Sequence, residues 1–142
     1  MGEIINRVTA CTPDGGWISV TGGEPTEQDI DVLVVALRRL CYRIALYTAG
    51  IRKITAPVDH LTVSPHSVAN WAQRYGTDLN VVPGLNGLTL EDWEPLCLEG
   101  RFEHRYVTPC SGLRNVAECV EFVRRHPEYR LGCQQHLQWK LP

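Results

Sequence analysis

Short apolar segments alternate with helix-like segments along most of this chain of 142 residues, and that alternation most constrains the fold. Six segments are typical of strands, most of them rich in β-branched or aromatic residues: 17–21, 43–48, 58–64, 79–82, 105–108 and 129–135. Segments with apolar residues at helical spacing separate most of them. Strands that alternate with helices or crossover loops favour a parallel sheet. The pattern alone therefore allows an incomplete α/β barrel or an open doubly wound sheet.

Local signals place the expected helices between these strands. The expected helical segments are residues 3–9, 30–41, 67–75, 90–98 and 115–126. Thr26 and Asp29 resemble a capping box for the second segment. Ser67 is expected to cap the short third helix and Gly76 to stop it, while Pro127 ends the last. With no repeats and no linker, residues 1–142 are expected to form a single domain.

The bulk composition excludes some classes of function. The net charge is -2, so the chain shows no basic footprint for nucleic acid. The longest apolar run, residues 32–37, is far too short for a membrane span, and the first residues do not form a signal peptide. A cytoplasmic location is therefore expected. The six scattered cysteines are expected to serve mostly as small buried apolar residues.

Two glycines directly follow the first expected strand. Gly22 and Gly23 let the backbone approach a ligand, and Glu24 after them offers a carboxylate to an ammonium group. Pro25 then fixes the exit of the turn. A tight turn without any ligand is the alternative. The tetrapeptide resembles the Gly-Gly-Glu-Pro motif of radical S-adenosylmethionine (SAM) enzymes, in which it holds the methionyl amino group.

An ordered set of further segments resembles the 7-carboxy-7-deazaguanine synthases, a family of radical SAM enzymes. Residues 47–50 are similar to their Glu-Thr-Asn-Gly strand end, and residues 61–66 to the strand that ends in Ser-Pro-Lys. Residues 106–112 are similar to their Gln-Pro-Cys-Asp-Gly turn, and residues 115–142 to their last helix, strand and tail. The resemblance implies a partial radical SAM α/β barrel of about six mostly parallel strands, without the first strand.

One departure from the family pattern concerns iron. These enzymes hold a 4Fe–4S cluster with three closely spaced cysteines upstream of the glycine motif, whereas here only Cys11 precedes Gly22. The other cysteines stand singly at positions 41, 97, 110, 119 and 133. The chain is therefore expected to lack the N-terminal part that binds the cluster, to be inactive alone, and to contain no metal ligands.

Ligands of parallel α/β folds bind at the carboxyl ends of the strands. Together with the resemblance, this assigns six residues to SAM: Gly22, Gly23, Glu24, Thr48, Ser64 and His66. His66 stands where the family has lysine, and a surface histidine is the alternative. Three residues of the tail are assigned to a pterin substrate: Gln134, His136 and the terminal carboxylate of Pro142. No residue is assigned to the catalytic step itself.

The resemblance implies a lyase of queuosine and 7-deazapurine biosynthesis. In that family the iron–sulfur cluster cleaves SAM, the radical so formed acts on 6-carboxy-5,6,7,8-tetrahydropterin, and Mg²⁺ assists the ring contraction. The family also implies a homodimer. Three interpretations remain open: a truncated or split synthase, a non-catalytic module that binds SAM or the pterin, and a radical SAM protein similar to an activating enzyme.

Overall fold

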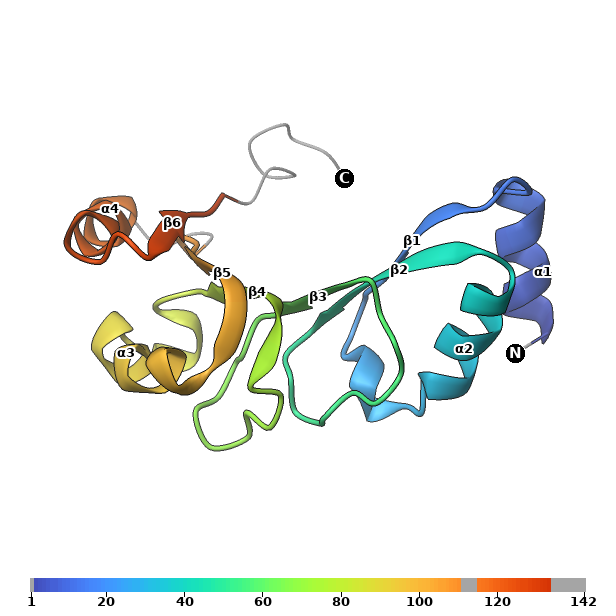
Figure 1. Ribbon diagram of the computed structural model, residues 1–142. Coiled ribbons are helices and arrows are strands. Elements are labelled where there is room, and N and C mark those ends of the chain that lie inside the picture. Colours follow the sequence, from blue (N-terminus) through green and yellow to red (C-terminus); the bar gives the residue numbers. More distant parts are fainter. Residues whose placement is uncertain (1, 111–114, 134–142) are drawn as a thin grey trace.

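The structure is a computed structural model, and it describes residues 2–110 and 115–133 (Figure 1). Its four α-helices are α1 (Gly2–Cys11), α2 (Asp31–Arg39), α3 (Leu90–Glu99) and α4 (Val116–Arg125). Its six strands are β1 (Gly16–Val20), β2 (Tyr42–Thr48), β3 (His60–Val63), β4 (Tyr75–Val81), β5 (Arg101–Val107) and β6 (Tyr129–Leu131). Two short 3₁₀ turns complete it: η1 (Pro25–Glu27) and η2 (Leu85–Gly87).

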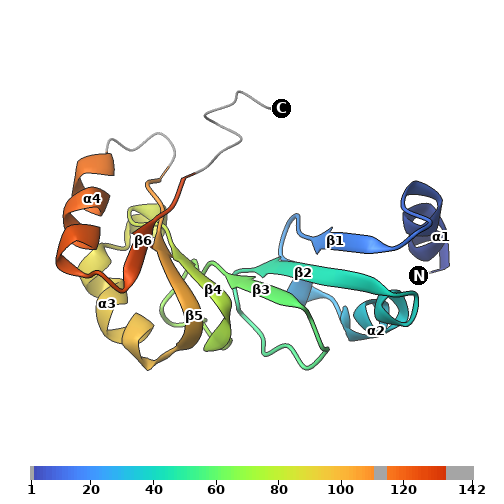
Figure 2. The same cartoon turned by 45° about the horizontal axis from the view of Figure 1, so that its top comes forward.

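The six strands form one parallel sheet in the order of the sequence, from β1 to β6. A doubly wound sheet reverses its strand order at a switch point, whereas a barrel keeps each strand beside its sequence neighbour. The order therefore favours the barrel-type arrangement and confirms the predicted α/β fold with six parallel strands. Figures 1 and 2 show a curved sheet that stays open between β1 and β6.

The sheet has one apolar face and one polar face, because successive side chains of a strand point to opposite sides. The apolar face carries the buried core, which includes Leu46, Val63, Leu79 and Val107. Helices α2, α3 and α4 add buried residues to the core, among them Leu37, Trp93 and Phe122. The other face, here called the polar face, carries Tyr47, Thr62, Asp78, Asn80 and Tyr106.

The helix predicted for residues 67–75 is absent, and the prediction is wrong. This segment is a loop, and Tyr75 and Gly76 belong to β4 instead. Its backbone bonds to another loop, since the amides of Ala72 and Gln73 both donate to the carbonyl of Gly50. The apolar spacing arose because Trp71 enters the core, where its ring stacks 6.3 Å from that of Phe102.

The predicted capping box of Thr26 and Asp29 is also wrong. Thr26 lies in η1, and its hydroxyl donates to Glu24 rather than capping a helix. Helix α2 begins only at Asp31, whose amide donates to the Asp29 carboxylate at 3.1 Å. The bounds of the strands also differ from those predicted: β4 and β5 begin four residues earlier, β1 and β2 begin one residue earlier, β3 covers only His60–Val63, and β6 ends at Leu131.

Strand β1 forms one edge of the sheet and pairs only with β2 among the described strands. Trp17 on this edge is 54% exposed, and the Arg43 guanidinium lies 5.7 Å from its ring centre. Within residues 2–110 and 115–133, none of the helices has the length and apolar character needed to cross a membrane.

Candidate functional site

The two glycines after β1 adopt backbone conformations that favour glycine. Gly22 has φ +88° and Gly23 has φ +52°, both in the left-handed region. A Cβ added at either position would meet no protein atom within 4 Å. The glycines are therefore required by the turn itself, and the space beside them is open to a ligand.

Glu24 is the centre of a hydrogen-bonded cluster that links the ends of β1 and β2. Its Oε1 accepts hydrogen bonds from the Thr26 amide at 3.0 Å and from the hydroxyls of Thr26 and Thr48. Its Oε2 accepts one from the Ala49 amide at 2.6 Å. An ionised carboxylate has about four acceptor sites. Most of this capacity is used within the protein, and Oε2 retains room for one further donor.

Thr48 helps to hold Glu24 in place. Its side chain is buried, and its hydroxyl oxygen also accepts a hydrogen bond from the Gly50 amide at 2.9 Å. Thr48 is therefore a hydrogen-bond partner of Glu24 that is supplied by the end of β2.

The cluster favours the charged form of Glu24. Burial raises the pKa of this carboxyl, but hydrogen bonds from the hydroxyls of Thr26 and Thr48 and from the amides of Ala49 and Thr26 outweigh it. The net pKa lies below the ordinary value for glutamate. Glu24 is thus an anion at neutral pH, held at the carboxyl end of the sheet.

A cavity of about 270 Å³ lies beside this cluster, at the carboxyl ends of β1, β2 and β3. Its lining residues are Glu24, Glu27, Ala49, Ile51, His66, Ser67, Asn70 and Asn86. The fold therefore brings together two of the residues that the sequence assigned to SAM, namely Glu24 and His66. We refer to this space as the carboxyl-end cavity.

Ser64 lies elsewhere, in a second cavity of about 440 Å³ on the polar face. The hydroxyl of Thr108 donates to Asn80 Oδ1 at 2.6 Å, and Asn80 Nδ2 lies 3.4 Å from Ser64 Oγ. The three residues form a polar chain across β3, β4 and β5. Ser64 and Thr108, which follow β3 and β5, thus share one cavity, which is distinct from the one beside Glu24.

The sequence reasoning missed a pair of residues in the cavity of the polar face. His60 Nε2 lies 3.1 Å from Asp78 Oδ2 and 3.2 Å from the Thr62 hydroxyl. The signal was present as polar residues at alternate positions, since His60 and Thr62 share one face of β3 and Ser64 follows directly after the strand. Knowledge of the register between β3 and β4 was needed to bring Asp78 beside them.

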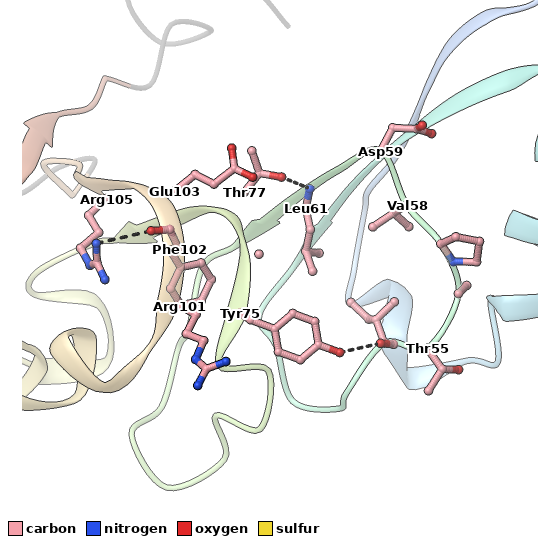
Figure 3. A pocket seen from close by; sticks show the side chains of 14 residues that line it. Thr55, Val58, Asp59, Leu61, Tyr75, Thr77, Arg101, Phe102, Glu103 and Arg105 are labelled. Atoms are coloured by element: carbon pink, nitrogen blue, oxygen red, sulfur yellow. Dashed lines mark hydrogen bonds between the residues drawn. The ribbon is translucent and has the colours of Figure 1, made fainter.

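A cavity of about 720 Å³, larger than these two, lies at the amino ends of β4 and β5 (Figure 3). Two polar groups around it are engaged within the protein: the Tyr75 hydroxyl donates to the Ile54 carbonyl, and Thr77 Oγ1 accepts from the Leu61 amide. Ligands of parallel sheets bind at the opposite, carboxyl ends of the strands. We therefore place the candidate site at the two smaller cavities.

Metal ligands do not gather in the part of the chain that the structure describes, where no group of three or more His, Cys, Asp or Glu residues is suited to an ion. Cys119 is buried in the core, which raises the pKa of its thiol to about 11. Cys11, Cys41 and Cys133 are exposed. The prediction that most cysteines are buried is therefore wrong for these three.

The predicted pterin residues Gln134, His136 and Pro142 lie outside the described residues, so their assignment stays a prediction. The remaining predicted site residues, Gly22 and Gly23, lie directly before Glu24 but do not line either small cavity.

Comparisons with known proteins identify the relatives of this chain, although no family model matches it. The 7-carboxy-7-deazaguanine synthase of Burkholderia multivorans is 31% identical over 129 residues, which cover 89% of this chain and 60% of that protein. The enzyme of the same name from Caulobacter vibrioides is 32% identical, and the matched region covers 92% of this chain and 61% of that enzyme.

A solved structure supports the same relation at the level of the fold. The crystal structure of QueE from Escherichia coli matches with a TM-score of 0.71, and the matched region covers 93% of this chain and 62% of the QueE chain. Its sequence identity is 17%, so it supports the fold alone. By sequence, this chain is thus similar over about nine tenths of its length to 7-carboxy-7-deazaguanine synthases, and it spans about three fifths of the length of the relatives it matches.

Proposed function

We propose that this chain supplies the SAM-binding and substrate-binding surfaces of a 7-carboxy-7-deazaguanine synthase, a lyase that contracts the ring of a small pterin. The observation that carries the proposal is the ionised Glu24 cluster beside an open cavity at the carboxyl ends of three parallel strands. Because the chain spans about three fifths of its relatives, the complete activity is part of the proposal.

The residues of the carboxyl-end cavity suit the methionyl part of SAM. The free acceptor site of Glu24 Oε2 can receive the ammonium group, because a charged donor and a charged acceptor form a strong hydrogen bond. Gly22 and Gly23 leave open space for the ligand's backbone-like atoms. In this proposal His66 contacts the ligand from the loop after β3, and Thr48 orients Glu24.

The cavity of the polar face suits a polar heterocycle. Ser64, Asn80 and Thr108 provide hydroxyl and amide groups, and Asp78 adds a carboxylate acceptor opposite the donors of a pterin ring. We assign this cavity to the pterin, with Ser64 at its boundary with SAM. Gln134, His136 and the Pro142 carboxylate remain proposed as further pterin contacts from the tail.

The described residues do not fit an iron–sulfur cluster, since they include no suitable group of cysteine ligands. In the complete family enzyme the cluster supplies the electron that cleaves bound SAM, and in this proposal residues beyond those of this chain hold it. Mg²⁺ and a homodimeric assembly likewise remain predictions from the family resemblance, and a cytoplasmic location remains a prediction from the sequence.

The test of SAM binding is Gly23→Val. A β-branched residue at φ +52° is strained, and its side chain enters the open space beside Glu24. Isothermal titration of this chain with SAM should show affinity reduced by about tenfold or more, corresponding to roughly 1.4 kcal/mol. Gly16→Val is the matched control, because Gly16 also has a positive φ, +130°, and a Cβ there also meets no atom within 4 Å, whereas it lies at the amino end of β1, away from the site. Equal affinity of Gly23→Val and wild type would contradict the proposal, as would a wild type that binds no SAM.

A second experiment tests the assignment of the cluster. This chain alone, reconstituted anaerobically with iron and sulfide, should release no 5′-deoxyadenosine from SAM, because no cysteine group suited to a cluster is present among residues 2–110 and 115–133. Chromatography of the reaction measures the product directly. Turnover by the chain alone would show that the cluster is held in a way that this proposal does not include.

A further inference from the structure

The loop between β4 and α3 has a tightly specified shape. Gly84, Asn86 and Gly87 all have left-handed backbones, with φ of +85°, +54° and +75°. The amide of Gly84 donates to the carbonyl of Leu88 at 2.7 Å, which closes the loop on itself. Asparagine is one of the few residues with a side chain that tolerates this conformation.

From this loop, the side chain of Asn86 reaches across to the loop that follows β3. Its Nδ2 donates a hydrogen bond to the backbone carbonyl of His66 at 2.9 Å. The ends of the His66 loop are anchored to the end of β2 and the loop after it, since the Ser64 amide donates to Thr48 and the Ala72 amide to Gly50. The Asn86 contact therefore holds the middle of a loop that is otherwise tied at its two ends.

Asn86 and His66 both line the carboxyl-end cavity, together with Glu24. The position of the His66 loop relative to Glu24 sets the width of that cavity. We propose that Asn86 is a positioning residue: through the His66 carbonyl it holds the loop after β3 in place over the cavity and thereby fixes the site for SAM. The role in SAM binding rests on the proposed function, whereas the contact between the two loops does not.

Two variants separate the hydrogen bond from the backbone conformation. Asn86→Asp keeps the side-chain shape and the tolerance for φ +54°, but replaces the donor with an acceptor that faces the His66 carbonyl. Asn86→Gly keeps the left-handed backbone and removes the side chain altogether. Asn6→Asp, on an exposed position of α1, is the control for the change in charge.

The first readout is amide hydrogen exchange of the full chain, measured by mass spectrometry on peptides that cover residues 64–71. Losing a hydrogen bond worth about 0.5–1.5 kcal/mol should speed exchange there by about 2- to 10-fold in both variants. Peptides from β2 should be unchanged and serve as the internal reference for folding. The second readout is SAM affinity by calorimetry, which should fall by a similar factor in both variants and stay constant in Asn6→Asp.

The outcomes are distinguishable. Faster exchange together with weaker SAM binding in both Asn86 variants supports the inference. Unchanged exchange at residues 64–71 in both variants overturns it, and so does faster exchange with unaltered SAM affinity, since the loop would then not position the site. Faster exchange in a protein whose wild type binds no SAM supports the contact between the loops and overturns the proposed function instead.

Discussion

Replacing Gly50 with alanine should lower the free energy of unfolding by about 3 kcal/mol, as the sum of a conformational cost of roughly 1–2 kcal/mol and an overpacking cost of roughly 1–3 kcal/mol. Gly50 has φ +72°, and an added Cβ would lie 2.7 Å from Val63 Cγ1, 3.2 Å from the Trp71 ring and 3.3 Å from Gln73 Cβ. All three neighbours are buried, so they cannot move aside at little cost.

Gly22→Ala is the matched control for this substitution. Gly22 also has a left-handed backbone, φ +88°, but its added Cβ would meet no protein atom within 4 Å. It should therefore show only the conformational cost, about 1–2 kcal/mol. Urea unfolding followed by circular dichroism measures both variants. Equal destabilisation of Gly50→Ala and Gly22→Ala would mean that the close packing around Gly50 adds nothing.

The parallel sheet was predictable because its central strands are short apolar runs between polar turns. Residues 43–48 and 58–64 carry their apolar side chains on one face of the sheet, and that face is buried. The strand order needed the structure, since a doubly wound sheet and a barrel-type sheet share the same alternation of elements. The early starts of β4 and β5 were missed because residues 75–78 and 101–104 are mostly polar or small.

The absent helix at residues 67–75 shows how tertiary contacts override a local pattern. The apolar spacing is helical, but the segment would cover only about two and a half turns, and short helices have little stability of their own. Instead, Gln73 is fully buried, accepts a hydrogen bond from the Ile54 amide and donates one to the Tyr75 carbonyl. Ile54 lies in another segment, and the local sequence carries no sign of this partner.

The sequence identified several residues of the candidate site, but it did not predict how they are arranged relative to one another. Glu24 was identified from the motif around it, yet its partners Thr48 and Ala49 are supplied by the end of the neighbouring strand. Likewise, His60 meets Asp78 only because β3 and β4 are neighbours in a defined register. The sequence names polar residues at strand ends, but the pairing of strands decides which of them meet.

Glu24→Gln should have the largest functional effect of any single substitution in the site. The amide has the same shape, but it carries no charge and one of its two terminal atoms no longer accepts hydrogen bonds. One of the donors around it, such as the Ala49 amide, therefore loses its partner. A buried donor left unpaired costs about 1–3 kcal/mol. SAM affinity should fall by about tenfold or more, because a charge-assisted hydrogen bond to the ammonium group is lost.

Calorimetric titration with SAM checks the loss of affinity, and urea unfolding checks the loss of stability. Glu99→Gln, at the exposed end of α3, removes the same charge away from the site and should change neither quantity. Unaltered SAM affinity in Glu24→Gln would exclude a direct contact between this carboxylate and the ligand.

The charge on Glu24 also predicts how the stability difference between wild type and Glu24→Gln depends on pH. Folding lowers the pKa of Glu24, so its contribution to stability is present above the unfolded pKa and is lost as pH falls through the folded pKa. The difference in free energy of unfolding between the two proteins should therefore be largest at pH 7, smaller at pH 4, and smallest at pH 3 and below.

Asp59 and Asp92 also have lowered pKa values, from hydrogen bonds with Arg38 and Thr89, but they are common to both proteins and cancel in the difference. Urea unfolding at each pH measures this difference. If it stays constant from pH 7 to pH 3, the ionised form of Glu24 does not stabilise the cluster, and the shape of its side chain alone accounts for the effect of the substitution.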